Sequence, residues 1–166
     1  MKRKRVLVLS SLAVMVGLLL AAFSPLLAQA LDRTVSQRVM KSVVQIVAAS
    51  RGRSGSLTSK WSGSGTIVSS DGLILTNCHV AKPRAMWNDP RFDYDVLIVA
   101  ITGRSDEPPQ PTYLAEVVQY DPGLDLAVIR ITQYLDGRKV DPAKLNLSAL
   151  PLGDSDDLEV GDPLYI

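Results

Sequence analysis

Two short stretches of the 166-residue sequence contain side chains that could act in nucleophilic catalysis. The only histidine, His79, follows an apolar run in LILTNCHVAKP. Imidazole exchanges protons near neutral pH, so a histidine held at a strand end suits a general base. The second stretch, GDSDD, contains Ser155 and at first sight resembles the surroundings of a nucleophilic serine. A lone histidine is also often structural or simply exposed, and the residues alone leave both interpretations of His79 open.

The elements that must position these residues are mainly strands. A short helix capped by Asp32 is expected within residues 31–41, and a mobile Ser/Gly/basic loop at residues 50–60. The Asp71-Gly72 pair predicts a tight hairpin turn. With little helical pattern elsewhere, the sequence predicts an all-β sandwich or barrel of mainly antiparallel pairs. Six β-type segments are expected, at residues 42–49, 65–70, 73–77, 95–102, 112–120 and 124–132.

Three motifs in order resemble a known family. GSGTIVSSDGLILTNCHVA resembles the histidine region of the trypsin-like serine proteases, most closely of their exported HtrA/Deg-type branch. DPGLDLAVIRI resembles the family's aspartate strand, and LPLGDSDDLEVGDPLYI the segment leading into its second barrel. The resemblance implies the first six-stranded antiparallel β-barrel of a double-barrel protease over residues 42–150. Residues 151–166 would be the interbarrel segment and the start of a second barrel that is otherwise missing.

Two residues receive catalytic roles from this resemblance. It makes His79 the general base and Asp125 the buried carboxylate that orients it, because such a carboxylate selects the imidazole tautomer and stabilises the imidazolium. Asp121 is the competing acid, but it precedes Pro122-Gly123 and better fits a turn. The alternative for Asp125 is a strand-end residue with a local backbone hydrogen bond.

The nucleophile departs from the family pattern. The family's serine is followed by two glycines, which allow a sharp turn and aim amide N–H groups at the oxyanion. Ser155 is followed by Asp156 and Asp157, whose charges would oppose a negative transition state. Ser155 is therefore expected to serve a turn or a helix cap. Two further departures are Cys78 beside the base and a longer stretch at residues 84–95, which is expected to form surface insertions near the cleft.

The N-terminus predicts export. Residues 1–30 have a basic start, an apolar run at residues 6–23 and a small-x-small end, which are typical of a cleaved signal peptide. An uncleaved membrane anchor through residues 6–23 is the alternative. Both place the remaining chain in the periplasm, the cell envelope or the extracellular space.

Charge and cysteine content exclude further classes. Without the four basic residues of the leader, 14 basic residues face 17 acidic ones, a net charge of −3 that argues against nucleic-acid binding. Cys78 is the only cysteine, so no intrachain disulfide can form, and a buried packing role is expected. Asp93 and Asp95 offer too few oxygens for a hard-cation loop, and no metal or cofactor is expected.

The resemblance implies a serine endopeptidase of protein quality control that acts on unfolded proteins or peptides, with homo-oligomerisation open. Because the nucleophile is absent, the 166-residue chain alone is expected to be inactive. The alternative is a catalytically inactive exported binding module, or pseudoprotease.

Overall fold

The structure, a computed structural model, describes residues 32–162. The expected signal peptide at residues 1–30 lies outside the described residues, as do residues 163–166 of the expected interbarrel segment and second-barrel start at residues 151–166. The chain divides into two units, Met1–Arg33 and Thr34–Ile166. The described elements are α2 (Arg33–Ser42), β1 (Val43–Arg51), β2 (Leu57–Ile67), β3 (Leu73–Thr76), α3 (Cys78–Ala81), α4 (Pro83–Trp87), η2 (Pro90–Phe92), β4 (Val96–Ile101), β5 (Gln110–Asp121), β6 (Leu126–Tyr134), α5 (Pro142–Leu145) and η3 (Ser155–Asp157).

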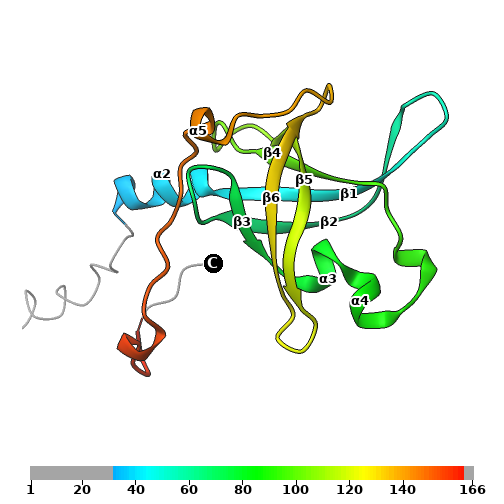
Figure 1. Cartoon of the computed structure of the whole chain (residues 1–166). Coiled ribbons are helices and arrows are strands. Elements are labelled where there is room, and N and C mark those ends of the chain that lie inside the picture. Colours follow the sequence, from blue (N-terminus) through cyan, green and yellow to red (C-terminus); the bar gives the residue numbers. More distant parts are fainter. Residues whose placement is uncertain (1–31, 163–166) are drawn as a thin grey trace, which may run out of the picture. The chain divides into compact units, whose positions relative to one another are not determined.

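Six strands form a closed barrel in the order β1-β2-β3-β6-β5-β4, and each neighbouring pair is antiparallel (Figure 1). The all-β class and the six-stranded antiparallel barrel expected from the sequence are therefore confirmed. Closure leaves every strand with two hydrogen-bonded neighbours, so no strand of the barrel offers a free edge along its whole length.

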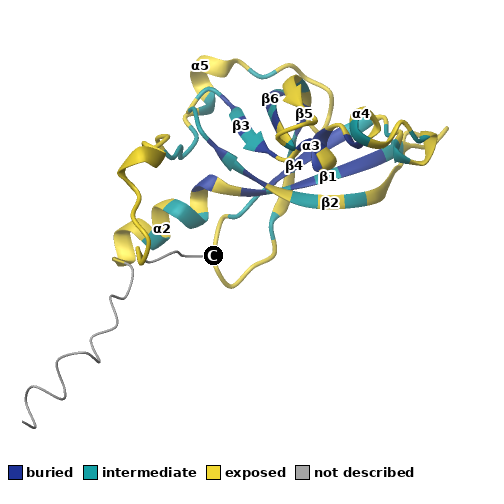
Figure 2. Cartoon of the chain, turned by 90° about the horizontal axis from the view of Figure 1, so that it is seen from below, coloured by how far each residue is buried: buried dark blue, intermediate teal, exposed yellow. Residues whose placement is uncertain are grey.

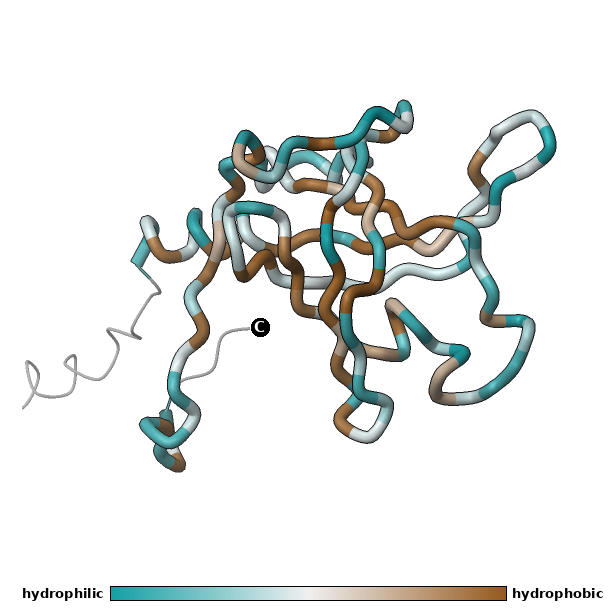
Figure 3. Tube along the Cα trace, viewed as in Figure 1, coloured by the Kyte–Doolittle hydropathy of each residue, from teal (hydrophilic) through white to brown (hydrophobic). Residues whose placement is uncertain are grey.

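Branched aliphatic side chains fill the barrel. Ile46, Ile67, Ile74, Val99 and Ile129 are fully buried and come from five different strands. In β1, β2, β3 and β6 they alternate with more exposed residues, because successive side chains of a strand point to opposite faces, whereas β4 is buried at four successive positions. Figure 2 shows the buried residues along the strands, and Figure 3 shows that hydrophobic residues follow the strands while hydrophilic ones occupy many of the connecting loops.

The predicted Asp71-Gly72 turn joins β2 and β3. Gly72 has a φ of 100°, a conformation that a side chain would strain. Its N–H donates to Ser69 O at 3.1 Å, and the N–H of Val68 donates to Leu73 O at 2.9 Å. This hairpin fixes where β3 begins and how it pairs with β2, and thus helps to position the segment that leads to His79.

Several boundaries differ from the sequence prediction, and residues 68–70, expected in a strand, form the turn between β2 and β3. Residues 57–60, expected in a loop, belong to β2 because their backbone pairs with residues 49–51 of β1. Their side chains are exposed, which explains the missing apolar periodicity. Ser42, expected in a strand, ends helix α2 and donates its hydroxyl to Arg38 O. Leu124 and Asp125, expected in a strand, lie in the turn before β6.

Short helices follow β3 at one end of the barrel. Helices α3 and α4 lie near the same ends of β5 and β6 (Figure 1), and η2 then leads back to β4. No helix within residues 32–162 has the length and apolar character needed to cross a membrane.

Candidate active site

His79 is mounted on a short helix directly after β3. The sequence places it at a strand end, whereas the structure places it as the second residue of α3, three residues beyond Thr76, the last residue of β3. The Thr76 hydroxyl donates to Ser64 O at 2.7 Å and ties the end of β3 to β2. The imidazole therefore stands on a helical turn that continues a strand of the barrel.

Asp125 lies in the hairpin turn between β5 and β6. Its φ is 52°, in the left-handed region that few non-glycine residues adopt. Asp121 builds the turn before it, because its Oδ1 accepts from the N–H groups of Gly123 at 2.8 Å and Leu124 at 3.1 Å. Asp121 itself is the last residue of β5 and contributes to the turn through its side chain, whereas the strand assignment of Asp125 is wrong because the chain must reverse there before β6 begins.

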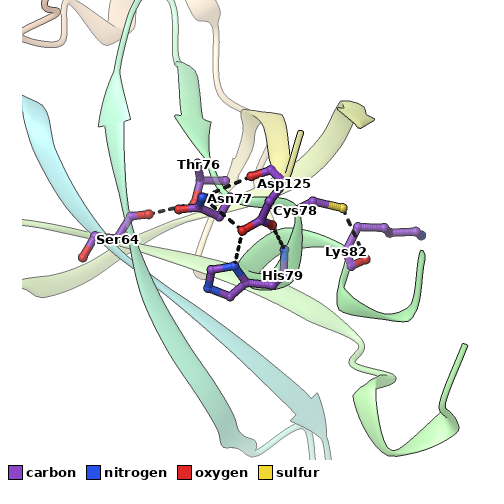
Figure 4. A network of polar contacts seen from close by, with 7 residues as sticks. All are labelled: Ser64, Thr76, Asn77, Cys78, His79, Lys82 and Asp125. Atoms are coloured by element: carbon purple, nitrogen blue, oxygen red, sulfur yellow. Dashed lines mark hydrogen bonds and ion pairs between the residues drawn. The ribbon is translucent and has the colours of Figure 1, made fainter. Parts of the chain in front are cut away.

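The structure brings His79 and Asp125 together through two contacts. The imidazole Nδ1 lies 2.7 Å from Asp125 Oδ2, and the backbone N–H of His79 donates to Oδ1 at 2.9 Å (Figure 4). The side-chain amide of Asn77 donates to Oδ2 at 3.3 Å and to the Asp125 carbonyl at 3.1 Å. Both carboxylate oxygens thus have donors, and the contacts fix the carboxylate plane relative to the imidazole.

These donors favour the ionised carboxylate. The backbone N–H of His79, followed by its imidazole, lowers the pKa of Asp125 below its usual value. The carboxylate is 35% exposed and the imidazole 46% exposed, so the expectation of a buried orienting acid is wrong for the described chain. Solvent therefore screens the carboxylate charge, and the orientation of the two side chains rests on the hydrogen bonds more than on Coulomb attraction.

The pair leaves the second ring nitrogen free. When Nδ1 donates to the carboxylate, neutral imidazole carries its acceptor on Nε2; this tautomer follows from the contacts. Within residues 32–162, His79 Nε2 has no hydrogen-bond partner. The arrangement can accept a proton at Nε2 and stabilise the imidazolium that results.

Ser155 lies apart from this pair. It begins η3, whose short red helix in Figure 1 is well separated from α3. Asp154 caps the helix by accepting from Asp156 N–H at 3.0 Å. This is the turn or cap chemistry expected of the GDSDD stretch, although the capping side chain is Asp154. None of the serine hydroxyls in the described chain hydrogen bonds to His79.

Cys78 immediately precedes His79 on α3. Its side chain is buried, as predicted, and its Sγ donates to Lys82 O at 3.8 Å. Burial, followed by the nearby Asp125 charge, raises the pKa of the thiol. The thiol thus stays protonated near neutral pH and is a poor nucleophile or metal ligand. No three His, Cys, Asp or Glu side chains of the described chain gather as they would around a metal ion.

Asn77 is the neighbour of the pair to which sequence reasoning gave no role. It stands at the N-cap of α3, yet its side chain makes no capping bond and instead donates to Asp125. A polar residue just before a short helix predicts a cap. Only the proximity of the β5–β6 turn redirects its amide.

The chain resembles known proteases over most of its length. Residues 63–166 match the family described as trypsin-like peptidase domain. A protein named probable periplasmic serine endoprotease DegP-like from Pseudomonas putida is 36% identical over 100 residues, 60% of this chain and 15% of that protein. Serine protease HTRA4 from Homo sapiens is 36% identical over 129 residues, 77% of this chain and 22% of that protein. Serine protease HTRA1 from Xenopus tropicalis is 39% identical over 101 residues, which are 61% of this chain and 16% of that protein.

The barrel, the motif order and these matches define the class. The chain belongs to the trypsin-like serine proteases, and within them to the HtrA/DegP type. It spans only 15–22% of the length of these three relatives.

Proposed function

We propose that the chain supplies the general base and orienting acid of an exported HtrA-type serine endopeptidase. His79 would take the proton of a serine hydroxyl at Nε2, and Asp125 would hold its Nδ1–H and stabilise the imidazolium. The supporting observation is the 2.7 Å contact between Nδ1 and Oδ2, which leaves Nε2 without a partner in the described chain.

The reaction would be acyl transfer. A serine oxygen attacks the peptide carbonyl while His79 removes its proton, and the same proton then passes to the leaving amine. A serine followed by two glycines does not occur in the 166 residues. We therefore propose that residues 42–150 form the first barrel, that residues 151–166 lead toward a second barrel, and that this chain alone has no peptidase activity.

Export and substrate class form part of the same proposal. Relatives named periplasmic support a periplasmic location, and the charge and apolar pattern of residues 1–30 supports a signal peptide, with a membrane anchor through residues 6–23 as the alternative. Unfolded proteins or peptides are the proposed substrates. Homo-oligomerisation is open to test by sedimentation.

Two assays test the catalytic proposal. The 166-residue chain, incubated with a reduced and unfolded protein, is expected to give no cleavage; cleavage that His79→Ala abolishes would contradict the missing nucleophile. The coding sequence beyond Ile166 is expected to encode Gly-Asn-Ser-Gly-Gly or Gly-Asp-Ser-Gly-Gly. In that longer product, Asp125→Asn should lower kcat by about 10⁴-fold because it removes the charge that selects the tautomer.

A second candidate is a non-catalytic binding module. Apolar side chains are exposed on the β5–β6 hairpin beside the pair, with Leu124 69% and Val118 54% exposed. Such side chains could bind extended apolar segments. Binding of an unfolded protein that Leu124→Asp weakens and His79→Ala leaves unchanged, together with a stop codon after Ile166, would favour this function.

A further inference from the structure

Helix α3, which carries His79, is too short to satisfy its own carbonyl groups. It has four residues, Cys78–Ala81, and the last four carbonyls of any α-helix lack intrahelical partners. Two of them accept from side chains of distant segments. The indole Nε1 of Trp61, on β2, donates to Val80 O at 3.0 Å, and the hydroxyl of Tyr94 donates to Ala81 O at 2.6 Å.

Both donors are neutral and retain their protons. Burial raises the pKa of Tyr94 to about 12, so its hydroxyl remains a donor throughout the physiological range. The indole N–H of Trp61 can only donate. These groups therefore satisfy the end of the helix without placing a second charge near the His79–Asp125 pair.

The two donors also brace each other. The rings of Trp61 and Tyr94 lie edge to face, with centroids 5.7 Å apart and planes at 83°. Phe92 adds a second edge contact to Trp61 at 6.2 Å. Such aromatic pairs are favourable beyond the apolar area that they bury. Trp61 and Tyr94 thus form one aromatic unit, which we call the aromatic clamp.

The opposite end of α3 is tied to Asp125. The N–H of Cys78 donates to Asp125 O at 3.2 Å, and the N–H of His79 donates to Asp125 Oδ1. The helix is therefore held at its N-terminal end by the acid and at its C-terminal end by the aromatic clamp. A loose C-terminal end would let the helix rock about the Asp125 contacts and carry the imidazole out of line with Oδ2.

We propose that Trp61 and Tyr94 are positioning residues that keep the His79 imidazole aligned with the Asp125 carboxylate. Residues 84–95, which the sequence suggests are a surface insertion, serve in this arrangement to bring Phe92 and Tyr94 back to the helix. The inference rests on the proposed function, because it takes His79 as the general base. The alignment of the imidazole with Asp125 can nevertheless be measured without a peptidase assay.

The test uses the single histidine of the full 166-residue chain. With ¹⁵N-labelled histidine, the two imidazole nitrogens give unique signals whose shifts report the ratio of Nδ1–H to Nε2–H tautomer. Tyr94→Phe and Trp61→Phe are expected to lower this ratio, by about threefold in the double variant, the effect of one net hydrogen bond. A ratio equal to that of the wild type in folded variants overturns the proposal.

Two matched variants control for general loosening. Tyr113→Phe removes a hydroxyl from a tyrosine on β5 that packs on Tyr134, and Tyr134→Phe removes the hydroxyl of that partner on β6. Both should leave the tautomer ratio unchanged. A fall in these controls as large as in the clamp variants would show that any aromatic change disturbs the pair, and would overturn the specific role.

If the clamp variants fail to fold, hydrogen exchange of the wild-type chain provides a second test. In the wild-type chain, the N–H of Lys82 donates to Cys78 O at 2.7 Å at the clamped end of α3. The clamp requires this amide to exchange hydrogen as slowly as the amides of β1. Exchange as fast as at Asn88, in the exposed end of α4, overturns the proposal. If the tautomer ratio responds as expected while His79 proves dispensable for peptidase activity in the longer product, the clamp stands and the proposed function fails.

Discussion

Replacement of Gly63 by alanine tests how closely β2 packs on the helix of His79. A Cβ at Gly63 would lie 2.4 and 2.7 Å from the two Cγ atoms of Val80 and 3.2 Å from its Cβ. Carbon atoms in contact normally lie about 3.5–4.0 Å apart. Rotation of the Val80 side chain relieves the clash only in part, because its Cβ, which rotation does not move, also lies too near at 3.2 Å. Helix α3 must therefore shift by at least a few tenths of an ångström, and this shift would lengthen the 2.7 Å contact between His79 and Asp125.

The expected cost follows from two opposing terms. Overpacking a well-filled site costs about 1–3 kcal/mol. Alanine restricts the unfolded chain more than glycine does and restores about 0.4–1 kcal/mol. The free energy of unfolding should therefore fall by about 1–2 kcal/mol, measured as a lower urea midpoint at constant slope.

A double variant assigns the cost to Val80. Val80→Ala removes the two clashing Cγ atoms, so the Gly63→Ala/Val80→Ala chain should be more stable than the sum of the single effects predicts, by about 1 kcal/mol. Gly103→Ala is the matched control, since a Cβ there meets nothing within 4 Å. Additive single effects, or a Gly63→Ala chain as stable as the Gly103→Ala chain, would refute the close packing of β2 on α3.

Three further predictions concern charge and burial. The ¹³C titration of the Asp125 carboxyl should have its midpoint below 3.8, and His79→Ala should raise that midpoint only part of the way, since the largest cause is the backbone N–H of residue 79. Because the folded pKa is lowered, the stabilisation by this carboxylate is present above pH 3.8 and is lost as the pH falls through the folded pKa, visible as a loss of stability in acid-unfolding curves. Cys78 should react with a thiol reagent at pH 8 far more slowly in the native chain than in urea, because burial raises its pKa. Arg104→Ala should leave the urea midpoint of unfolding unchanged, since its ion pair with Asp106 is exposed and screened by solvent.

The strands could be predicted because local pattern and burial agree. Ile46 and Val99 lie in runs of β-branched residues, and both are fully buried. The prediction missed residues 57–60 because exposed strand residues carry no apolar alternation, and their pairing partner is a strand elsewhere in the sequence. It misplaced Asp125 because the left-handed turn depends on where β5 and β6 meet.

The candidate site divides in the same way. His79 and Asp125 were identified from motifs, and their 2.7 Å contact joins residues 46 positions apart. The roles of Asn77, Trp61 and Tyr94 were not foreseen. Each of these contacts depends on the direction of one side chain toward a backbone or carboxylate group from another segment, and local sequence carries no signal for such directions.

The sequence by itself determined the class of protein through its motifs, and it determined the number of strands through local periodicity. It also identified the candidate base and acid, and it showed that no serine in these 166 residues is followed by two glycines, because these features depend on residue identity. Only the tertiary structure decided how the barrel closes, which oxygen of Asp125 faces the imidazole, and which aromatic donors hold the end of α3. The physical reason is that these features are hydrogen bonds and packing contacts between segments far apart in the chain, which form only when the barrel has brought those segments together.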